Sequence, residues 1–523
     1  MQNISSIIET AAQEMFNFLA DKFPVACASD EFYFFPHYVL PDQNWKTWDN
    51  FSDESIAETC SYLSSFESEL EYCNTNPADR KENYDKLFLS CFTRTLREQL
   101  TEYKIWKRQP SFYLTITCLG LEQALGSGNP DAVHDRASGL PAFLDQARLN
   151  LCEVPEIYAD IAGQMLADII EFIRSLVPRL PELIFALPAL ERFSDSLSEV
   201  QVHEHPVLPV EAYEKLLRDH FTMNLSLKEI EELIDLEYRE MNQVLQEESG
   251  KLSPRRSKHS IPLGWTDIYN RLPEPDIKVI NKILLYRSEI EELRRHCNKY
   301  GLIPGRVDDR CPVKVSSLPP YLSAIRSSSS YSISPGIPVP GGTFFVPENP
   351  GATEQYQEEL REYRMLTAHE TWPGHHLLDA CRFLLVSKTR RFIERPLFYE
   401  GWACFGEELC NRTGYFTGPG DRLILAKRRF WRAARGKVDI GLNTGRLNIL
   451  SAGEYLKKAG IPVERALSSV RKYTLNPGYQ LCYTIGLRRF LDLFDKRGQH
   501  SISDFTKTVL LNGETFTNLI SVL

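Results

Sequence analysis

The sequence predicts a mainly helical protein with one small region of a different kind. Apolar residues recur at helical spacing through most of the 523 residues, and 43% of the chain is apolar, which is enough for a large buried core. From residue 301 to residue 350, Pro, Gly and Ser crowd together instead. Length alone would allow roughly two to four domains. A single large helical body fits the pattern as well.

The helical segments follow one another along the first 300 residues. Apolar positions predict helices at residues 4–19, 54–73, 84–106, 112–125, 140–151, 157–176 and 178–197. A Glu-rich segment at 225–246 predicts a solvated helix, with Ser226 as its N-cap and Glu229 in the capping-box position. Residues 262–300 predict another helical pair. We expect these elements to serve as scaffold and core.

The segment 301–350 predicts either a small sheet or a long connecting loop. The run Thr-Phe-Phe-Val at 343–346 combines β-branched and aromatic residues, as short strands do. A helix at 354–371 follows it, and a later helix at 398–411 comes after Pro396. A sheet in this place could hold an extended peptide-like ligand through its backbone groups.

Two motifs in the second half of the chain predict a metal site. They read H-E-T-W-P-G-H-H from His369 and E-G-W-A from Glu400. Two His and one Glu are a known ligand set for a catalytic Zn²⁺ that keeps its fourth position open. His369 and either His375 or His376 would supply nitrogen, and Glu400 would supply oxygen. Glu370 would then remain as a general base.

Proline makes this spacing unusual. In one continuous helix, a residue six positions after His369 would lie about 9 Å further along the axis, too far to bind the same ion. Pro373 interrupts a helix and Gly374 permits unusual dihedral angles, so the chain could fold back and return a second His to the metal. The simpler alternative is a His-Glu pair on the surface and a His cluster at a helix terminus.

These motifs resemble the signatures H-E-x-x-P-G-H and E-G-W-A of a large, mainly bacterial family catalogued as a domain of unknown function. The segments R-G-K-V-D-I-G-L from Arg435 and P-G-Y-Q-L-C-Y-T-I-G from Pro477 resemble it too. The family is similar to the gluzincin metallopeptidases, which include thimet oligopeptidase and angiotensin-converting enzyme. The resemblance implies a helical body around a deep cleft, with His369, Glu370, His375 and Glu400 at its core. It therefore favours His375 over His376 as a ligand.

Further residues are expected around the metal. Tyr483 matches a family position, and its hydroxyl is a good neutral donor for an oxyanion. The expected substrate-binding residues are Arg435, Asn443, Tyr479, Gln480 and His376. Two positions depart from the family: Asn443 stands where a His is usual, and Leu378 where a Gln is usual. Glu407 and Glu408 are expected to be solvated, although one of them could orient a ligating imidazole.

The predicted function is a zinc-dependent hydrolase that cleaves an amide bond in a short peptide or amino-acid conjugate, with Glu370 as general base. Fe²⁺ or Mn²⁺ could replace Zn²⁺. One alternative is another metal-dependent enzyme of small metabolites, such as a lyase, a transferase or an oxidative enzyme. A second alternative is an inactive binding protein. We expect residues 1–300 to form the scaffold and cleft wall and residues 301–523 the metal-binding catalytic region, within one continuous body.

The composition of the chain limits the kinds of binding partner and the cellular location that we expect. A formal charge of −10 argues against nucleic acid, and the basic segment 251–258 is expected to be an exposed loop. No stretch of about 20 apolar residues predicts a membrane span. The 12 cysteines are scattered, as in reducing compartments, and the amino terminus does not look like a secretory signal. We therefore expect a cytoplasmic protein, whose oligomeric state the sequence leaves open.

Overall fold

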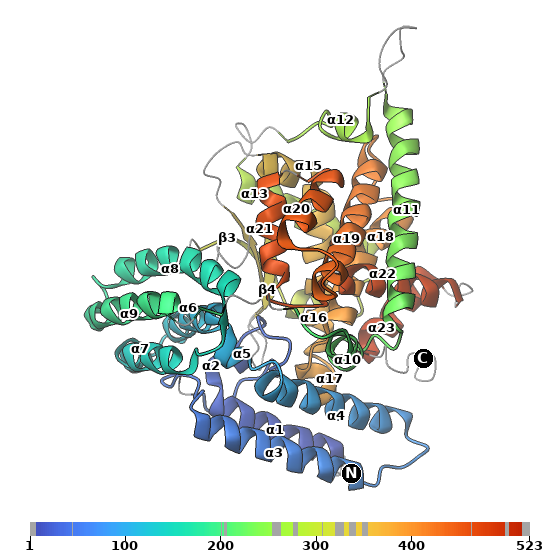
Figure 1. The fold of residues 1–523 in the computed structure, drawn as a ribbon. Helices are drawn as coiled ribbons and strands as arrows, with labels where there is room; N and C mark the ends of the chain where they lie inside the picture. The colour runs from blue at the N-terminus through green and yellow to red at the C-terminus, as the bar shows by residue number, and fades with distance from the viewer. Residues whose placement is uncertain are drawn as a thin grey trace.

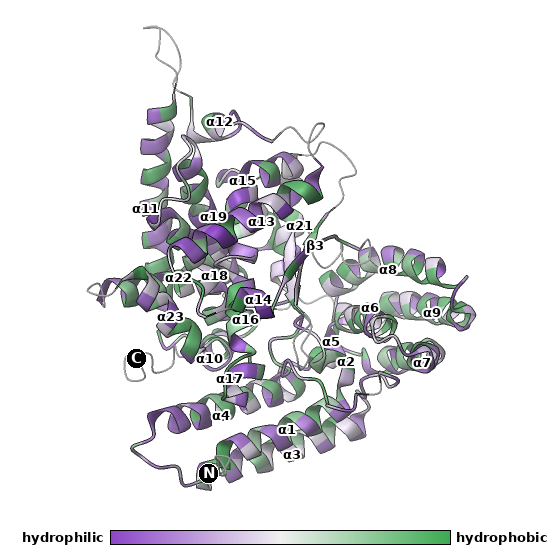
Figure 2. Ribbon diagram, turned by 180° about the vertical axis from the view of Figure 1, so that it is seen from behind, coloured by the Kyte–Doolittle hydropathy of each residue, from purple (hydrophilic) through white to green (hydrophobic). Residues whose placement is uncertain are grey.

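The computed structural model describes residues 7–43, 45–199, 201–202, 207–253, 263–275, 281–305, 307–319, 329–333, 341–347, 354–461, 463–496 and 501–514. These residues are mainly helical, with a small sheet, so the coarse part of the predicted fold class is confirmed. Figure 2 shows polar and apolar stretches alternating along most helices, as expected where one helix face is buried and the other is exposed. Most of the predicted basic loop at 251–258 lies outside the described residues, because these resume only at residue 263 after residue 253.

The amino-terminal half is a set of packed helices (Figure 1). They are α1 (Ile7–Lys22), α2 (Pro24–Cys27), α3 (Asp53–Tyr72), α4 (Arg80–Thr101), α5 (Ile105–Arg108), α6 (Pro110–Gly126), α7 (Pro130–Asn150), α8 (Glu156–Leu176), η1 (Pro181–Phe185), α9 (Ala186–Glu199) and α10 (Val210–Asp219). Strands β1 (Val154–Pro155) and β2 (Gln201–Val202) pair in parallel between them. In Figure 1, α1, α3 and α4 form the base of the molecule, and α6 to α9 form a lobe at its side.

Helix α11 (Leu227–Leu252) begins at its predicted cap. The Ser226 hydroxyl accepts a hydrogen bond from the Glu229 N–H, and the Glu229 carboxylate accepts one from the Ser226 N–H. The expectation of a solvated helix is wrong for one of its faces. That face packs against α19 (Asp421–Asn443), and Glu237 on it is 1% exposed and paired with Arg429 at 2.7 Å. A Glu-rich helix can be buried where facing arginines neutralise its charges.

The segment 301–350 contains a three-stranded sheet. Strands β3 (Val313–Ser317), β4 (Ser330–Ile333) and β5 (Gly342–Val346) lie in the order β3-β5-β4. β5 runs parallel to β3 and antiparallel to β4, and Tyr331 is in register with Phe344. The predicted strand at 343–346 is confirmed. In Figure 1 this sheet lies between the lobe of α6 to α9 and the carboxy-terminal helices.

The remaining helices surround the predicted motifs. They are α12 (Trp265–Tyr269), α13 (Lys282–Lys299), α14 (Val307–Arg310), α15 (Glu354–Glu370), α16 (His375–Arg382), α17 (Lys388–Phe392), α18 (Pro396–Arg412), α20 (Ile449–Lys458), α21 (Val463–Tyr473), α22 (Tyr479–Lys496) and α23 (Ile502–Asn512). Pro396 begins α18 as its first residue, where its missing N–H costs nothing.

Helices α18 and α22 cross at two glycines. A Cβ atom added to Gly486 would lie 2.4 Å from the Leu397 carbonyl oxygen, and one added to Gly401 would lie 2.6 Å from the backbone of Gly486. No other residue fits at either position without moving the backbones apart. This contact explains the glycine of the E-G-W-A motif, because it brings α22 next to Glu400.

The two predicted regions of the chain are joined by contacts. The Lys388 N–H donates to the Glu9 carboxylate at 2.9 Å, and the His37 N–H donates to the Phe392 carbonyl at 2.7 Å. The division at residue 300 and the deep gluzincin-like cleft stay predictions. Within the described residues, no helix is both long enough and apolar enough to cross a membrane.

Candidate metal centre

Three buried side chains meet at one point. One potential ligand atom each from His369, His375 and Glu400 lies within 4.8 Å of the others. The Nε2 atoms of both His rings are 3.5 Å from Glu400 Oε2. Donor atoms bound tetrahedrally to one Zn²⁺ at the usual bond lengths are separated by roughly 3.4 Å. The spacing in the protein therefore matches a shared metal ion.

The chain folds back sharply between the two histidines. Helix α15 ends at Glu370 and α16 begins at His375, with a cis peptide bond between Trp372 and Pro373. The Gly374 N–H donates to the Ala368 carbonyl at 3.0 Å, and a Cβ atom on Gly374 would lie 1.8 Å from the His369 carbonyl oxygen. Only glycine fits against the end of α15 at this distance. The Pro-Gly step thus returns His375 to His369, with 4.8 Å between the ring centroids.

The E-G-W-A motif also supports this turn. The Trp402 indole N–H donates to the Pro373 carbonyl at 2.9 Å, and Trp402 is fully buried. Glu400 is two residues earlier on the same helix, so one helix carries the carboxylate and anchors the loop that positions His375. The role of Trp402 could not be predicted from the sequence, because nothing in the sequence shows which carbonyl its N–H will reach.

Glu407 contacts His369 on the side of the ring away from Glu400. Its Oε1 atom is 3.0 Å from His369 Nδ1, and the residue is fully buried. Arg428 and Arg432 bind the same carboxylate at 3.0 Å and 2.5 Å. The expectation of a solvated acid is wrong for Glu407, because these two guanidinium groups replace the water around it. A carboxylate that accepts Nδ1–H leaves Nε2 free to bind a metal, as in other carboxylate–histidine–metal arrangements.

His376 faces away from this point. Its Nε2 is 3.0 Å from the Cys311 carbonyl oxygen, which fixes Nε2 as the donor, and its Nδ1 is 3.1 Å from the Tyr331 hydroxyl. The residue is fully buried against Trp372. Both ring nitrogens therefore have partners within the protein, which leaves neither for a metal or a substrate.

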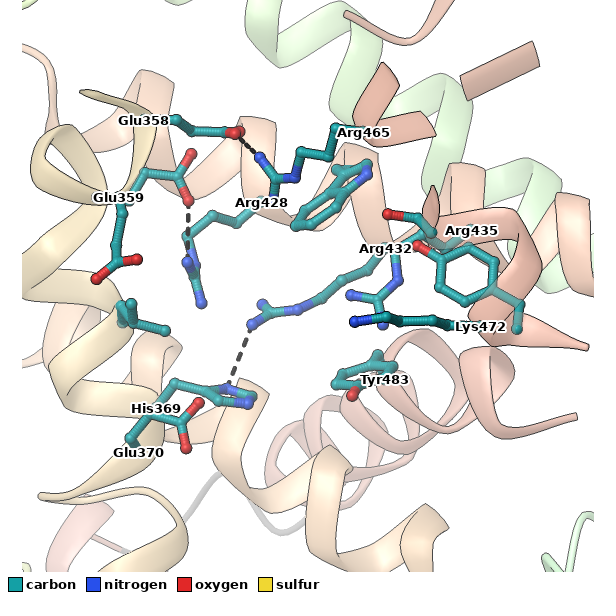
Figure 3. A pocket seen from close by; sticks show the side chains of 15 residues that line it. Glu358, Glu359, His369, Glu370, Arg428, Arg432, Arg435, Arg465, Lys472 and Tyr483 are labelled. Atoms are coloured by element: carbon teal, nitrogen blue, oxygen red, sulfur yellow. Dashed lines mark hydrogen bonds and ion pairs between the residues drawn. The ribbon is translucent and has the colours of Figure 1, made fainter. Parts of the chain in front are cut away.

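Glu370 lies beside the three ligand candidates and lines a pocket of about 230 Å³. Its Oε2 atom accepts a hydrogen bond of 3.0 Å from the Tyr331 N–H in strand β4. The small sheet therefore orients this carboxylate. His369 and Tyr483 line the same pocket (Figure 3).

The tyrosines of α22 lie on the metal side of that helix. The Tyr479 hydroxyl donates to Glu400 Oε1 at 2.8 Å. The ring of Tyr483 is stacked near that of His369, with 6.5 Å between centroids. Burial and the nearby Glu400 charge raise the pKa of Tyr483 well above its ordinary value. Its hydroxyl is therefore protonated at neutral pH and can donate a hydrogen bond.

Arg435 lines the pocket, whereas its partner Gln480 supports it from outside the lining. Gln480 Oε1 accepts from Arg435 Nε at 2.8 Å and from its Nη2 as well. Gln480 is buried, with 7% of its surface exposed, and its side-chain oxygen contacts Arg435 instead of the pocket.

Asn443 is also outside the pocket lining. Its amide donates to the Asp439 carboxylate at 2.8 Å, and it is 4% exposed. Asp439 also accepts from the backbone N–H groups of Gly478 and Gln480. This cluster holds the start of α22 in place. The departure from the family at Asn443 thus concerns a buried contact outside the pocket lining.

The electrostatics of the three candidates suit a cation. Burial opposes the charge on Glu400, but the two imidazoles outweigh it and lower the pKa of Glu400 well below its ordinary value. Burial likewise opposes a charge on His369, but the neighbouring Cys404 thiol and the carboxylates of Glu400 and Glu407 raise the pKa of His369 well above its ordinary value. His375 Nδ1 and Glu400 Oε2 are buried without hydrogen-bond partners among the described residues. Two imidazole nitrogens and one carboxylate oxygen are a donor set that Zn²⁺ accepts.

Comparison with known proteins identifies the family. A family described as "Bacterial protein of unknown function (DUF885)" matches residues 40–515. The chain belongs to this family. No curated protein matches this DUF885 chain.

Two solved structures share the fold. A "putative lipoprotein of unknown function" from Shewanella oneidensis has a TM-score of 0.74 at 16% identity, and the match covers 99% of each chain. A "putative lipoprotein" from Colwellia psychrerythraea has a TM-score of 0.76 at 15% identity, with 98% of this chain and 97% of that one covered. At these identities the likeness extends to the fold alone. The cytoplasmic location of the DUF885 chain stays a prediction.

Proposed function

We propose that this DUF885 protein is a metal-dependent hydrolase that cleaves an amide bond in a short peptide or an amino-acid conjugate. The observation that carries the proposal is the meeting of His369, His375 and Glu400 within 4.8 Å, beside a pocket that Glu370 lines. The resemblance of the motifs at His369 and Glu400 to those of a family similar to the gluzincin metallopeptidases supports the proposal. His369 and His375 would hold the ion through Nε2, and Glu400 through Oε2.

When bound by His369, His375 and Glu400, a divalent cation such as Zn²⁺ would supply a water of lowered pKa and would polarise the carbonyl to be attacked. Glu370 takes the proton of the attacking water and delivers it to the leaving nitrogen. The hydrogen bond from the Tyr331 N–H holds Glu370 Oε2, so the other carboxylate oxygen can face the reacting water. Glu370 is half-buried, so its carboxylate can exchange protons with a water molecule or a substrate in the pocket.

Tyr483 stabilises the charge that develops on the carbonyl oxygen. Its raised pKa keeps the hydroxyl protonated, so it can donate to an oxyanion. Tyr479 has a different task, because its hydroxyl donates to Glu400 and holds that carboxylate in place. The pocket of about 230 Å³ is small compared with the roughly 300–1,000 Å³ of typical ligand pockets, which favours small substrates.

The test combines metal analysis with one substitution. Purified protein should contain about one Zn²⁺, Fe²⁺ or Mn²⁺ per chain, and should release amino acids or amines from a library of dipeptides, tripeptides and acyl-amino acids. Glu370→Gln should retain the metal and lose roughly 10²- to 10⁴-fold in kcat. The matched control is Glu359→Gln, because Glu359 lines the same pocket but is paired with Lys282 at 3.0 Å.

Two outcomes would contradict the proposal. One is full hydrolytic activity in Glu370→Gln, and the other is a folded protein that binds no divalent metal. Metal binding without hydrolysis of any library member would favour the alternative of a lyase, a transferase or an oxidative enzyme. Retention of a ligand by the metal-free protein would favour a binding protein.

A further inference from the structure

The pocket beside the candidate metal centre contains charges that are mostly neutralised within the protein. Arg465 pairs with Glu358, and Arg428 pairs with Glu362 at 2.9 Å. Arg432 binds Glu407 at 2.5 Å. Each of these three cations lines the pocket and pairs with at least one carboxylate.

Two other cations of the same pocket lack such a partner. Arg435 and Lys472 line it, and within the described residues no ion pair joins either of them to a carboxylate. Figure 3 shows both reaching in from the side opposite Glu359. A half-buried ammonium or guanidinium group without a counter-charge is unfavourable, so an anion entering the pocket would be stabilised there.

The surroundings of Arg435 hold its guanidinium without neutralising it. Gln480 binds Nε and Nη2 through a neutral oxygen. The rings of Trp431 and Tyr483 lie 5.0 Å and 4.5 Å from Arg435 Cζ. These contacts orient the planar fork and leave Nη1 available, an arrangement suited to binding a planar carboxylate.

The adjacent pocket has more acids than cations among its lining residues. It shares Lys472 with the first pocket, but it is also lined by Asp30, Glu31 and Glu394 and by aromatic side chains such as Phe32. Asp30 and Glu31 would repel an anion. The first pocket also carries several glutamates, which makes it suit a single negative charge better than a doubly charged group such as phosphate.

We propose that Arg435 and Lys472 bind a free carboxylate of the substrate, so that the enzyme cleaves amide bonds close to a carboxylate end. This inference rests on the proposed hydrolase function. Tyr483 lies between Arg435 and the candidate metal centre, because its ring is 4.5 Å from Arg435 Cζ and 6.5 Å from the His369 ring. The two distances together place Arg435 Cζ at most about 11 Å from the His369 ring. A residue of extended chain spans at most about 3.6 Å, so the carboxylate lies within about three residues of the bond that is cleaved.

The test compares each peptide as a free acid with the same peptide as a carboxy-terminal amide. The free acids should have about 10- to 100-fold higher kcat/KM, mainly through KM, as expected for the loss of charged hydrogen bonds. Arg435→Gln and Lys472→Gln should each reduce this preference, and Arg435→Lys should restore part of it. Arg465→Gln is the matched control, because it removes a cation of the same pocket that already has a carboxylate and should keep the preference.

Calorimetry separates this inference from the hydrolase proposal. Binding of the same acids and amides to Glu370→Gln protein reports on carboxylate recognition without catalysis. Equal hydrolysis and equal binding of acid and amide would overturn the carboxylate site and leave the hydrolase intact. If no peptide is hydrolysed, preferential binding of the acid still supports the site, and equal binding overturns it.

Discussion

Glu407 Oε1 lies 3.0 Å from Nδ1 of His369, on the opposite side of the ring from the Nε2 atom that faces Glu400. The carboxylate is fully buried and also accepts hydrogen bonds from Arg428 and Arg432. These contacts join the candidate metal centre to helix α19. The ionised state of Glu407 is favoured, since burial raises its pKa but the two arginines lower it well below the ordinary value.

We expect Glu407→Gln to weaken metal binding by about 10-fold or more, in the range found for other carboxylates that hydrogen-bond to a metal-binding histidine. The substitution removes the negative charge and leaves two arginines near the ion. Competition with a chelator measures the affinity, and circular dichroism verifies the fold. Glu408→Gln is the control, because Glu408 pairs with Arg412 at 3.0 Å away from His369. Equal affinities in the two variants would rule out the supporting role.

Tyr483→Phe should lower kcat by roughly 10²- to 10³-fold with a smaller effect on KM, because an oxyanion donor acts in the transition state. Tyr473→Phe is the matched control, since Tyr473 lines the same pocket. Steady-state kinetics on the best library substrate measures both constants. A normal kcat in Tyr483→Phe would remove this residue from the mechanism.

Gly486→Ala should destabilise the protein by about 1–3 kcal/mol, the usual cost of overpacking. Its Cβ atom would meet the Leu397 carbonyl oxygen at 2.4 Å, so α18 and α22 must separate, and Glu400 must move with α18. Metal affinity should therefore fall too. Gly163→Ala in α8 is the control, because a Cβ atom there meets nothing within 4 Å. This substitution should raise the free energy of unfolding by about 0.5–1 kcal/mol, since alanine favours a helix more than glycine does. Urea unfolding of both variants tests the contrast, and unchanged stability in Gly486→Ala would contradict the contact.

Asp439 should make stability depend on pH. Burial raises its pKa to about 6, although the Gly478 N–H and the Tyr213 hydroxyl favour the charged form. The native state therefore holds this proton more tightly than the unfolded chain does. The resulting stability is complete below about pH 4 and is lost as the pH rises to about 6.

The measurement is urea unfolding of the wild type and Asp439→Asn between pH 4 and pH 7. The stability of the wild type relative to the variant should decrease from pH 4 to pH 6 and then level off. A difference that stays constant or grows with pH would show that this carboxyl does not titrate with a raised pKa.

Several parts of the molecule follow from local sequence alone. The helical periodicity, the cap at Ser226 and Glu229, and the strand at 343–346 depend on neighbouring residues, and the structure contains each of them. The Pro-Gly break after α15 also has a local cause, because Pro373 cannot continue a helix. The residues proposed as ligands could also be predicted locally, because they belong to two short sequence motifs.

Tertiary structure decided the rest. His375 and His376 are consecutive in α16, so their side chains point about 100° apart, and only the packing of the helix determines which one faces Glu400. The burial of Glu407 depends on arginines 21 and 25 positions away, and Lys472 reaches the pocket from a separate helix. Such contacts join segments that are distant in sequence. Local periodicity therefore determined the elements and the motifs, while the crossing of α18 and α22 at Gly401 and Gly486 determined how those motifs meet.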